Sequence, residues 1–128
     1  DVISRLDLKN ATAICERAEN LTGSYDFVVS RATAPLSDLY KWSKPKISSK
    51  QINAVPNGII CLKGGDLTEE IKPFKGRTEI VPLTDYFTED YFITKKLLFL
   101  TTWLSIKLIF FTKNPFPIQL FKYFCTPF

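Results

Sequence analysis

A run of three adjacent β-forming residues, Phe27-Val28-Val29, stands in the first quarter of the chain and is followed by Ser30 and Arg31. Such a run without polar alternation is typical of a strand that is covered on both faces in a parallel sheet. Open sheets of this kind bind ligands at the carboxyl ends of their strands. We therefore predict a central strand at residues 26–30, with Arg31 as a candidate site residue at its end.

A helix is expected soon after this strand. Pro35 suits the first turn of a helix, because the N–H group that proline lacks would have no intrahelical partner there. Pro45 should end the helix near Lys44, because the residue before a proline avoids the α region. The same order of strand, loop and helix returns at residues 59–62 and 66–71. This repetition predicts an α/β fold with a parallel sheet.

The pattern changes after Gly76. Residues 78–83 and 96–100 are two further strand candidates with no helical pattern between them, which predicts an antiparallel finish to the sheet. Pro82 indicates that the first of these two strands lies at an edge, because proline cannot donate to a neighbouring strand. A short strand is also expected at residues 11–15.

The net charge of +4 is spread unevenly along the chain. Residues 1–96 hold 14 basic and 13 acidic residues, a balance of +1, and residues 97–128 add three lysines and no acid. Between Asp38 and Asp66 there are five lysines and no acid: Lys41, Lys44, Lys46, Lys50 and Lys63. Such a run fits a surface that faces phosphates, and equally a solvated loop.

The three cysteines, Cys15, Cys61 and Cys125, are widely spaced, and the chain has no histidine and no CxxC motif. Neither a disulfide framework nor a metal site follows from this pattern. Cys15 and Cys61 lie in apolar runs, so we expect them to be buried, inert thiols in a reducing cytoplasm.

Residues 101–128 differ in composition from the rest. They contain no glycine, no acid and six of the 11 phenylalanines. The apolar run at 97–111 is shorter than the roughly 20 residues needed to span a bilayer. We expect residues 1–100 to form the folded domain, and three interpretations of the tail stay open: a read-through end, an extension that packs on the sheet, or a membrane-associated segment.

Four motifs occur in the order and spacing found in a known family of bacterial enzymes. They are Arg17-Ala18-Glu19, Val28-Val29-Ser30-Arg31-Ala32, Asn57-Gly58-Ile59-Ile60-Cys61-Leu62-Lys63-Gly64-Gly65 and Tyr91-Phe92-Ile93-Thr94-Lys95-Lys96. Through them, residues 1–100 resemble the C-terminal part of the ribosomal RNA small-subunit methyltransferase G family, also called glucose-inhibited division protein B.

The resemblance implies a partial Rossmann-like sheet of the class I methyltransferase type, whose strands are ordered 3-2-1-4-5-7-6. Residues 11–15 would be strand 3 and residues 26–30 strand 4, and the first two strands have no counterpart in the chain. We therefore expect a sheet in the order 26–30, 59–62, 96–100, 78–83, with 96–100 antiparallel to its neighbours. Residues 11–15 should either sit loosely or move in beside residues 26–30.

The activity that the resemblance implies is methyl transfer from S-adenosylmethionine to N7 of a guanine in 16S rRNA. N7 has a free lone pair, so the transfer needs alignment and exclusion of water more than a general base, and no catalytic residue is assigned. The family's glycine-rich cofactor loop and ribose-binding acid have no counterpart here. We expect a fragment that is inactive alone, monomeric, cytoplasmic and free of metal.

Site residues follow from the matching motifs. The resemblance implies that Ala18 and Glu19 line the adenine end of the cofactor site, and that Arg31 faces the cofactor and the incoming nucleotide. Lys63 could approach an RNA phosphate beside Gly64-Gly65, or the two glycines could simply form a tight turn. The four other lysines of the acid-free run are the remaining RNA-contact candidates.

Two other functions remain open on the sequence. One is a different Rossmann-type nucleotide-binding domain, although the chain has no GxGxxG motif. The other is a small membrane-associated protein that uses the phenylalanine-rich tail.

Overall fold

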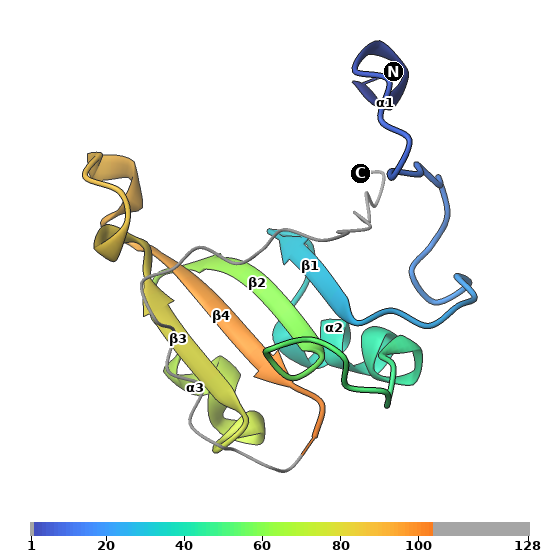
Figure 1. The fold of residues 1–128 in the computed structure, drawn as a ribbon. Coiled ribbons are helices and arrows are strands. Elements are labelled where there is room, and N and C mark those ends of the chain that lie inside the picture. The colour runs from blue at the N-terminus through green and yellow to red at the C-terminus, as the bar shows by residue number, and fades with distance from the viewer. Residues whose placement is uncertain (1, 104–128) are drawn as a thin grey trace.

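The computed structural model describes residues 2–103, and a single four-stranded sheet organises them (Figure 1). Its strands are β1 (Phe27–Arg31), β2 (Gly58–Gly64), β3 (Thr78–Pro82) and β4 (Lys95–Thr101), in the order β1-β2-β4-β3. β1 and β2 are parallel, whereas β4 runs antiparallel to both of its neighbours. The predicted strand order and the antiparallel finish are confirmed, and β3 with Pro82 is an edge strand as predicted.

The helices are short; α1 (Val2–Arg5) precedes the sheet, and α2 (Leu36–Ser43) and α3 (Thr68–Ile71) follow β1 and β2. Single 3-10 turns lie at Lys44–Lys46, Lys72–Phe74, Leu83–Asp85 and Asp90–Phe92. α2 ends where Pro45 enters its 3-10 extension, as predicted. Asp66 accepts hydrogen bonds at 2.9 and 2.6 Å from the amide and hydroxyl of Thr68, the first residue of α3.

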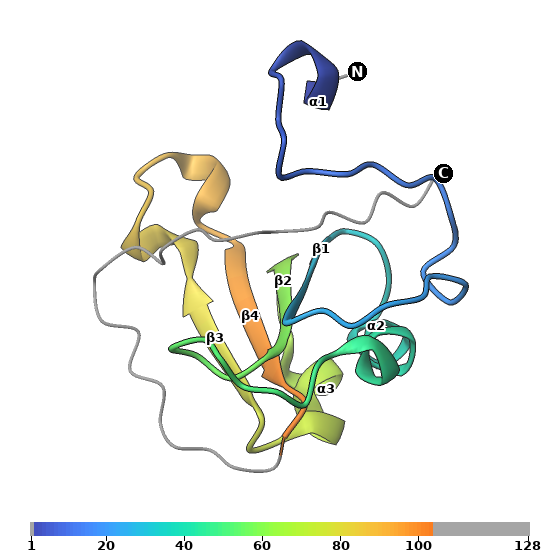
Figure 2. The ribbon, with the colours of Figure 1, turned by 45° about the vertical axis from the view of Figure 1, so that its right-hand side comes forward.

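The hydrophobic core lies between one face of the sheet and the two helices α2 and α3 (Figure 2). Alternate strand residues supply it: Val28, Ile59, Cys61, Leu98 and Leu100 are all buried. Burial along β1 alternates, so the expectation of a strand covered on both faces is wrong for the described residues. The physical reason is that α2 and α3 pack on the same face.

The segment before β1 departs from the sequence prediction. Residues 11–15 form no strand, Ile14 is 55% exposed and Cys15 is exposed, so the prediction of a buried thiol there is wrong. Figures 1 and 2 show this segment running away from the sheet toward α1. A strand needs a partner for its backbone groups, and residues 11–15 pair with no strand in the described part of the chain. They sit loosely, which is one of the two expected outcomes.

Asn57 fastens the loop that precedes β2. Its side-chain amide donates to Asp26 Oδ1 at 3.1 Å, to the Ser48 carbonyl at 3.1 Å and to the Lys50 carbonyl at 2.9 Å. Its backbone N–H donates to Gln51 Oε1 at 2.7 Å, and the residue is completely buried. The predicted turn at residues 56–58 is therefore held by one side chain that connects the loop to the start of β1.

Gly58 follows at a point where β2 and β4 approach closely. A Cβ atom on Gly58 would lie 2.4 Å from the Leu100 carbonyl oxygen and 3.0 Å from the ring of Phe99. No other residue type fits there without moving a strand.

β4 continues one residue past the expected domain boundary, since Thr101 ends the strand and is buried. Apart from residues 101–103, the predicted tail lies outside the described residues, and so does Cys125.

Candidate functional site

The carboxyl end of β1 turns sharply into the loop before α2. Arg31 ends the strand and is exposed, and Ala32 has a φ of +52°, in the left-handed region that residues with a Cβ rarely occupy. Ser30 Oγ donates to Thr33 Oγ1 at 3.0 Å, and Thr33 Oγ1 donates to the Arg31 carbonyl at 3.2 Å. These two hydroxyls hold the turn in a conformation that costs about 1 kcal/mol or more.

A pocket opens beside the same strand, between β1, α2 and the segment that contains Ala18. Val28, Leu39 and Trp42 give it apolar walls, and Ser30 lies at its edge near the end of the strand. The structure thus brings Ala18, a predicted cofactor residue, to the carboxyl half of β1. Arg31 is the next residue along the strand but is not part of the pocket lining.

Lys46 holds the Ala18 segment in place. Its Nζ donates to the Glu19 carbonyl at 3.2 Å and to the Trp42 carbonyl at 3.3 Å. The Glu19 side chain is 37% exposed and forms an ion pair with Arg17 at 3.2 Å. A hydrogen bond from its own backbone amide and a second from Arg17 lower the pKa of Glu19, so its carboxylate is charged and can accept hydrogen bonds at neutral pH.

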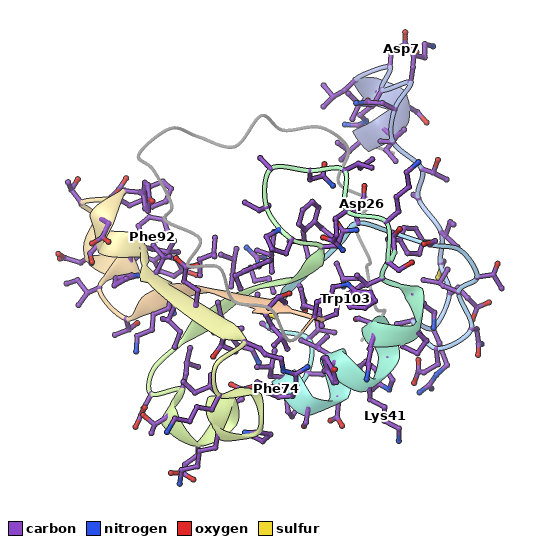
Figure 3. All side chains as sticks on the ribbon, turned by 60° about the horizontal axis from the view of Figure 1, so that its bottom comes forward. Asp7, Asp26, Lys41, Phe74, Phe92 and Trp103 are labelled. Atoms are coloured by element: carbon purple, nitrogen blue, oxygen red, sulfur yellow. The ribbon has the colours of Figure 1, made fainter. Side chains whose placement is uncertain are left out.

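The five candidate lysines do not form one surface. Lys41 and Lys44 are exposed around the end of α2, and Lys41 points away from the body of the protein (Figure 3). Lys50 belongs to the loop at the amino end of β2, whereas Lys63 lies near the carboxyl end of that strand. At about 3.3 Å per residue, the strand separates these two positions by roughly 17 Å. The fold therefore does not place these five lysines side by side on one phosphate-binding surface.

Lys63 is largely buried within the protein. Its side chain is 15% exposed and forms an ion pair with Glu70 at 2.7 Å.

Gly65, two residues after Lys63, has a φ of +75° and no atom within 4 Å of the position that a Cβ would take. Gly64 ends β2, and Gly65 makes a tight turn that needs the left-handed conformation.

An aromatic cluster lies at the same edge of the sheet, in the connection between β3 and β4. The rings of Phe87 and Phe92 stack with centroids 4.3 Å apart, and Tyr91 meets Phe92 edge to face at 5.2 Å; Phe92 is labelled in Figure 3. Lys95 Nζ lies 4.8 Å from the centroid of Tyr91. Gly65 N–H donates to the Thr94 carbonyl at 3.1 Å, which ties this connection to the turn after β2.

Sequence reasoning missed two contributors to this edge. Glu70 was expected only as a helical residue, yet its carboxylate contacts both Lys63 and the start of α2. Thr33 was expected only as a loop residue. A carboxylate at the end of a four-residue helix has no local pattern that reveals such a partner, whereas a Ser-x-x-Thr spacing at a strand end could have indicated the hydroxyl pair.

Within residues 2–103, no three His, Cys, Asp or Glu side chains gather closely enough to hold a metal ion. Among the helices of this same range, none is long and apolar enough to cross a membrane.

The sequence that contains these site residues was compared with known protein families. The family model described as GidB, rRNA small subunit methyltransferase G, matches residues 1–96. The chain belongs to the rRNA small subunit methyltransferase G family. The match covers all three cofactor-site candidates, the five lysines and the aromatic cluster.

Curated relatives agree with this assignment. The ribosomal RNA small subunit methyltransferase G of Bacteroides fragilis is 48% identical over 101 residues, which are 79% of this chain and 49% of that protein. The protein of the same name from Bacteroides thetaiotaomicron is 50% identical over 99 residues (77% and 48%), and that from Christiangramia forsetii is 44% identical over 100 residues (78% and 47%). The chain spans about half the length of these relatives. No solved structure matches it significantly.

Proposed function

We propose that this polypeptide corresponds to the C-terminal part of an S-adenosylmethionine-dependent methyltransferase that modifies N7 of a guanine in 16S rRNA. The observation that carries the proposal is the placement of Ala18 in a pocket against the carboxyl half of β1, in a chain whose relatives are named as rRNA methyltransferases. The carboxyl edge of an α/β sheet is the usual place for such a site.

The residues present fit one end of the cofactor. A purine ring needs apolar walls for its faces and a hydrogen-bond acceptor for its amino group. Val28, Leu39 and Trp42 supply apolar walls beside Ala18, and the charged carboxylate of Glu19 is an acceptor on the adjoining residue. When bound, S-adenosylmethionine supplies the methyl group. No residue of this chain is proposed for its methionine or ribose parts.

Arg31 is the proposed contact to RNA. It is exposed at the end of β1, one residue beyond the pocket lining, and guanidinium groups bind phosphates and guanine edges well. Guanine N7 is already a nucleophile, so the protein's task is to align it and exclude water, which requires no histidine. Lys41, Lys44 and Lys50 are exposed and would add phosphate contacts outside this edge.

The proposed partner is 16S rRNA or the small ribosomal subunit. We therefore propose that the protein acts in the cytoplasm. We also propose that it acts as a monomer and without a metal ion. Residues 104–128 have no assigned role in this function.

The proposal is tested by two binding measurements on the 128-residue chain. Calorimetric titration should show no significant binding of S-adenosylmethionine, because the chain has no counterpart of the glycine-rich loop. A dissociation constant in the micromolar range would contradict this expectation. Filter binding of a 16S rRNA transcript should be weak, should decrease with KCl and should weaken further in the Arg31→Ala variant. Lys72→Met, which removes an exposed charge that is paired with Glu69 and not with the turn after β1, is the control. Equal binding by Arg31→Ala and the parent would reject Arg31 as an RNA contact.

A further inference from the structure

Lys63 and Glu70 form a largely buried ion pair that contacts the turn following β1. Lys63 Nζ lies 2.7 Å from Glu70 Oε1, and their side chains are 15% and 25% exposed. The other ion pair of α3, between Lys72 and Glu69, is 64% and 80% exposed. Of the two pairs, only the first is sheltered from water, so it keeps more of its attraction in salt.

The pair also binds the backbone of the turn on both sides of Pro35. Lys63 Nζ donates to the Ala34 carbonyl at 2.9 Å, and Glu70 Oε1 accepts the Leu36 N–H at 2.7 Å. α2 has no side-chain cap of its own at Pro35, so Glu70 supplies the missing acceptor from another helix. Each charged group thus satisfies its partner and one backbone group.

Glu70 is charged under ordinary conditions. Burial raises the pKa of its carboxyl group, but the hydrogen bonds from Lys63 and from the Leu36 amide outweigh that effect and hold the pKa below its ordinary value. The lysine and the carboxylate therefore act together as a charged clamp that joins β2, α3 and the turn.

The turn held by this clamp is the one that carries Arg31. Its left-handed residue, Ala32, is unfavourable without support, and the Ser30 and Thr33 hydroxyls stabilise the turn from within. We propose that Lys63 and Glu70 are positioning residues that fix the turn from Arg31 to Leu36 and thereby orient Arg31 for RNA. This inference rests on the proposed function for Arg31. It assigns Lys63 to the protein's own backbone instead of to an RNA phosphate.

The first test needs no RNA. Lys63→Met keeps the apolar stem of the side chain and removes its charge, which leaves the Glu70 carboxylate without a counter-ion and favours its turning toward water. Hydrogen exchange measured by NMR should then show the Leu36 amide exchanging faster by about tenfold or more, because its acceptor is lost. Amides in the β2–β4 ladder should speed up by a clearly smaller factor than the Leu36 amide, and the exposed-pair control Lys72→Met should leave the Leu36 amide unchanged.

Glu70→Gln is the second variant. Its side-chain oxygen can still accept the Leu36 N–H, so the exchange rate should rise less than in Lys63→Met. Unchanged exchange at Leu36 in Lys63→Met would overturn the clamp. An equal rise throughout the sheet would overturn it as well, because that result indicates a general loss of stability.

The second test asks whether Lys63 acts through Arg31. In filter binding of a 16S rRNA transcript, Lys63→Met should weaken affinity several-fold in the parent and should have no further effect in Arg31→Ala, and Lys63→Arg should restore binding. A direct phosphate contact would instead give losses that add, and a salt slope lower by about 0.7–0.9 for the lost lysine. Additive losses would overturn the positioning role. If Arg31→Ala alone had no effect, the proposed function would fail, and the exchange rates would still decide the clamp.

Discussion

Gly58→Ala should be among the most damaging single-methyl changes in this fold. The added Cβ would lie 2.4 Å from the Leu100 carbonyl oxygen, whereas ordinary contact begins at 3.4 Å. β2 and β4 would have to separate by about 1 Å at this point, because a backbone oxygen cannot rotate out of the way as a flexible side chain can. The clash lies where Gly58 pairs with Thr101, beside the buried pair of Ile59 and Leu100.

The expected cost is about 3 kcal/mol of unfolding free energy. Overpacking a tight site costs about 1–3 kcal/mol. Each strand hydrogen bond that the separation weakens adds about 0.5–1.5 kcal/mol. Replacing glycine also reduces the entropy of the unfolded chain, which stabilises by only about 0.4–1 kcal/mol and cannot hide the clash.

The assay is urea unfolding followed by circular dichroism, with Gly65→Ala as the matched control. Gly65 has open space around it and a φ of +75°, so alanine there meets conformational strain alone and should cost about 1 kcal/mol. The difference between the two variants isolates the contact with Leu100. A Gly58→Ala protein within about 0.5 kcal/mol of the parent would refute the close approach of the two strands.

Three further outcomes are expected. Asn57→Ala should lower the unfolding free energy by about 2–4 kcal/mol in urea titrations, because the three hydrogen bonds from its side-chain amide to Asp26, Ser48 and Lys50 are lost, at about 0.5–1.5 kcal/mol each; a loss below about 0.5 kcal/mol would mean that water replaces the amide. The pKa of Glu70 is below its ordinary value of 4.5, so its contribution to stability is present above that pH and is lost as pH falls through the folded-state pKa. The stability gap between the parent and Glu70→Gln should therefore narrow on acidification below 4.5, and a constant gap would argue against the charged clamp. Burial raises the pKa of Cys61 to about 11, so iodoacetamide at pH 8 should label the exposed Cys15 and spare Cys61, as read by peptide mass spectrometry, and equal labelling would contradict the burial.

The positions of β1 and β2 could be predicted because each contains an apolar run between clear turn signals. Phe27-Val28-Val29 and Ile59-Ile60-Cys61 need no tertiary information to be recognised, and both lie in strands of the sheet. Their order could not come from such patterns, since strand neighbours are set by long-range packing. It came from the family resemblance, and the structure confirms it.

Burial was harder to predict than secondary structure. An apolar run such as Ala13-Ile14-Cys15 resembles a strand locally, but it has no partner strand in the described part of the chain, so Ile14 and Cys15 are exposed. The same limit applies to β1, where Val28 faces the helices and is buried while Val29 is only half buried. Which face receives helices depends on the connections between strands, and local composition does not encode that.

The candidate site was predicted in part. The resemblance brought attention to Ala18 and Arg31, and the structure places them beside the pocket and at the end of the same strand. Charge alone could not separate Lys63, which is paired with Glu70, from the exposed Lys41, because a sequence does not state where a carboxylate on another element will come to lie.

The position of β4 in the sheet also affects how the protein is made. β4 lies between β2 and β3, yet among the four strands of the described residues it is the last to be synthesised. At about 5–20 residues per second, the 37 residues that follow Gly64, up to and including Thr101, take roughly 2–7 s to translate. During that time β2 has a neighbour on one side only and β3 has none, so the apolar strands are available to chaperones and to other nascent chains. Substitutions that slow the closure of β4 should therefore reduce the yield of folded protein more than its final stability.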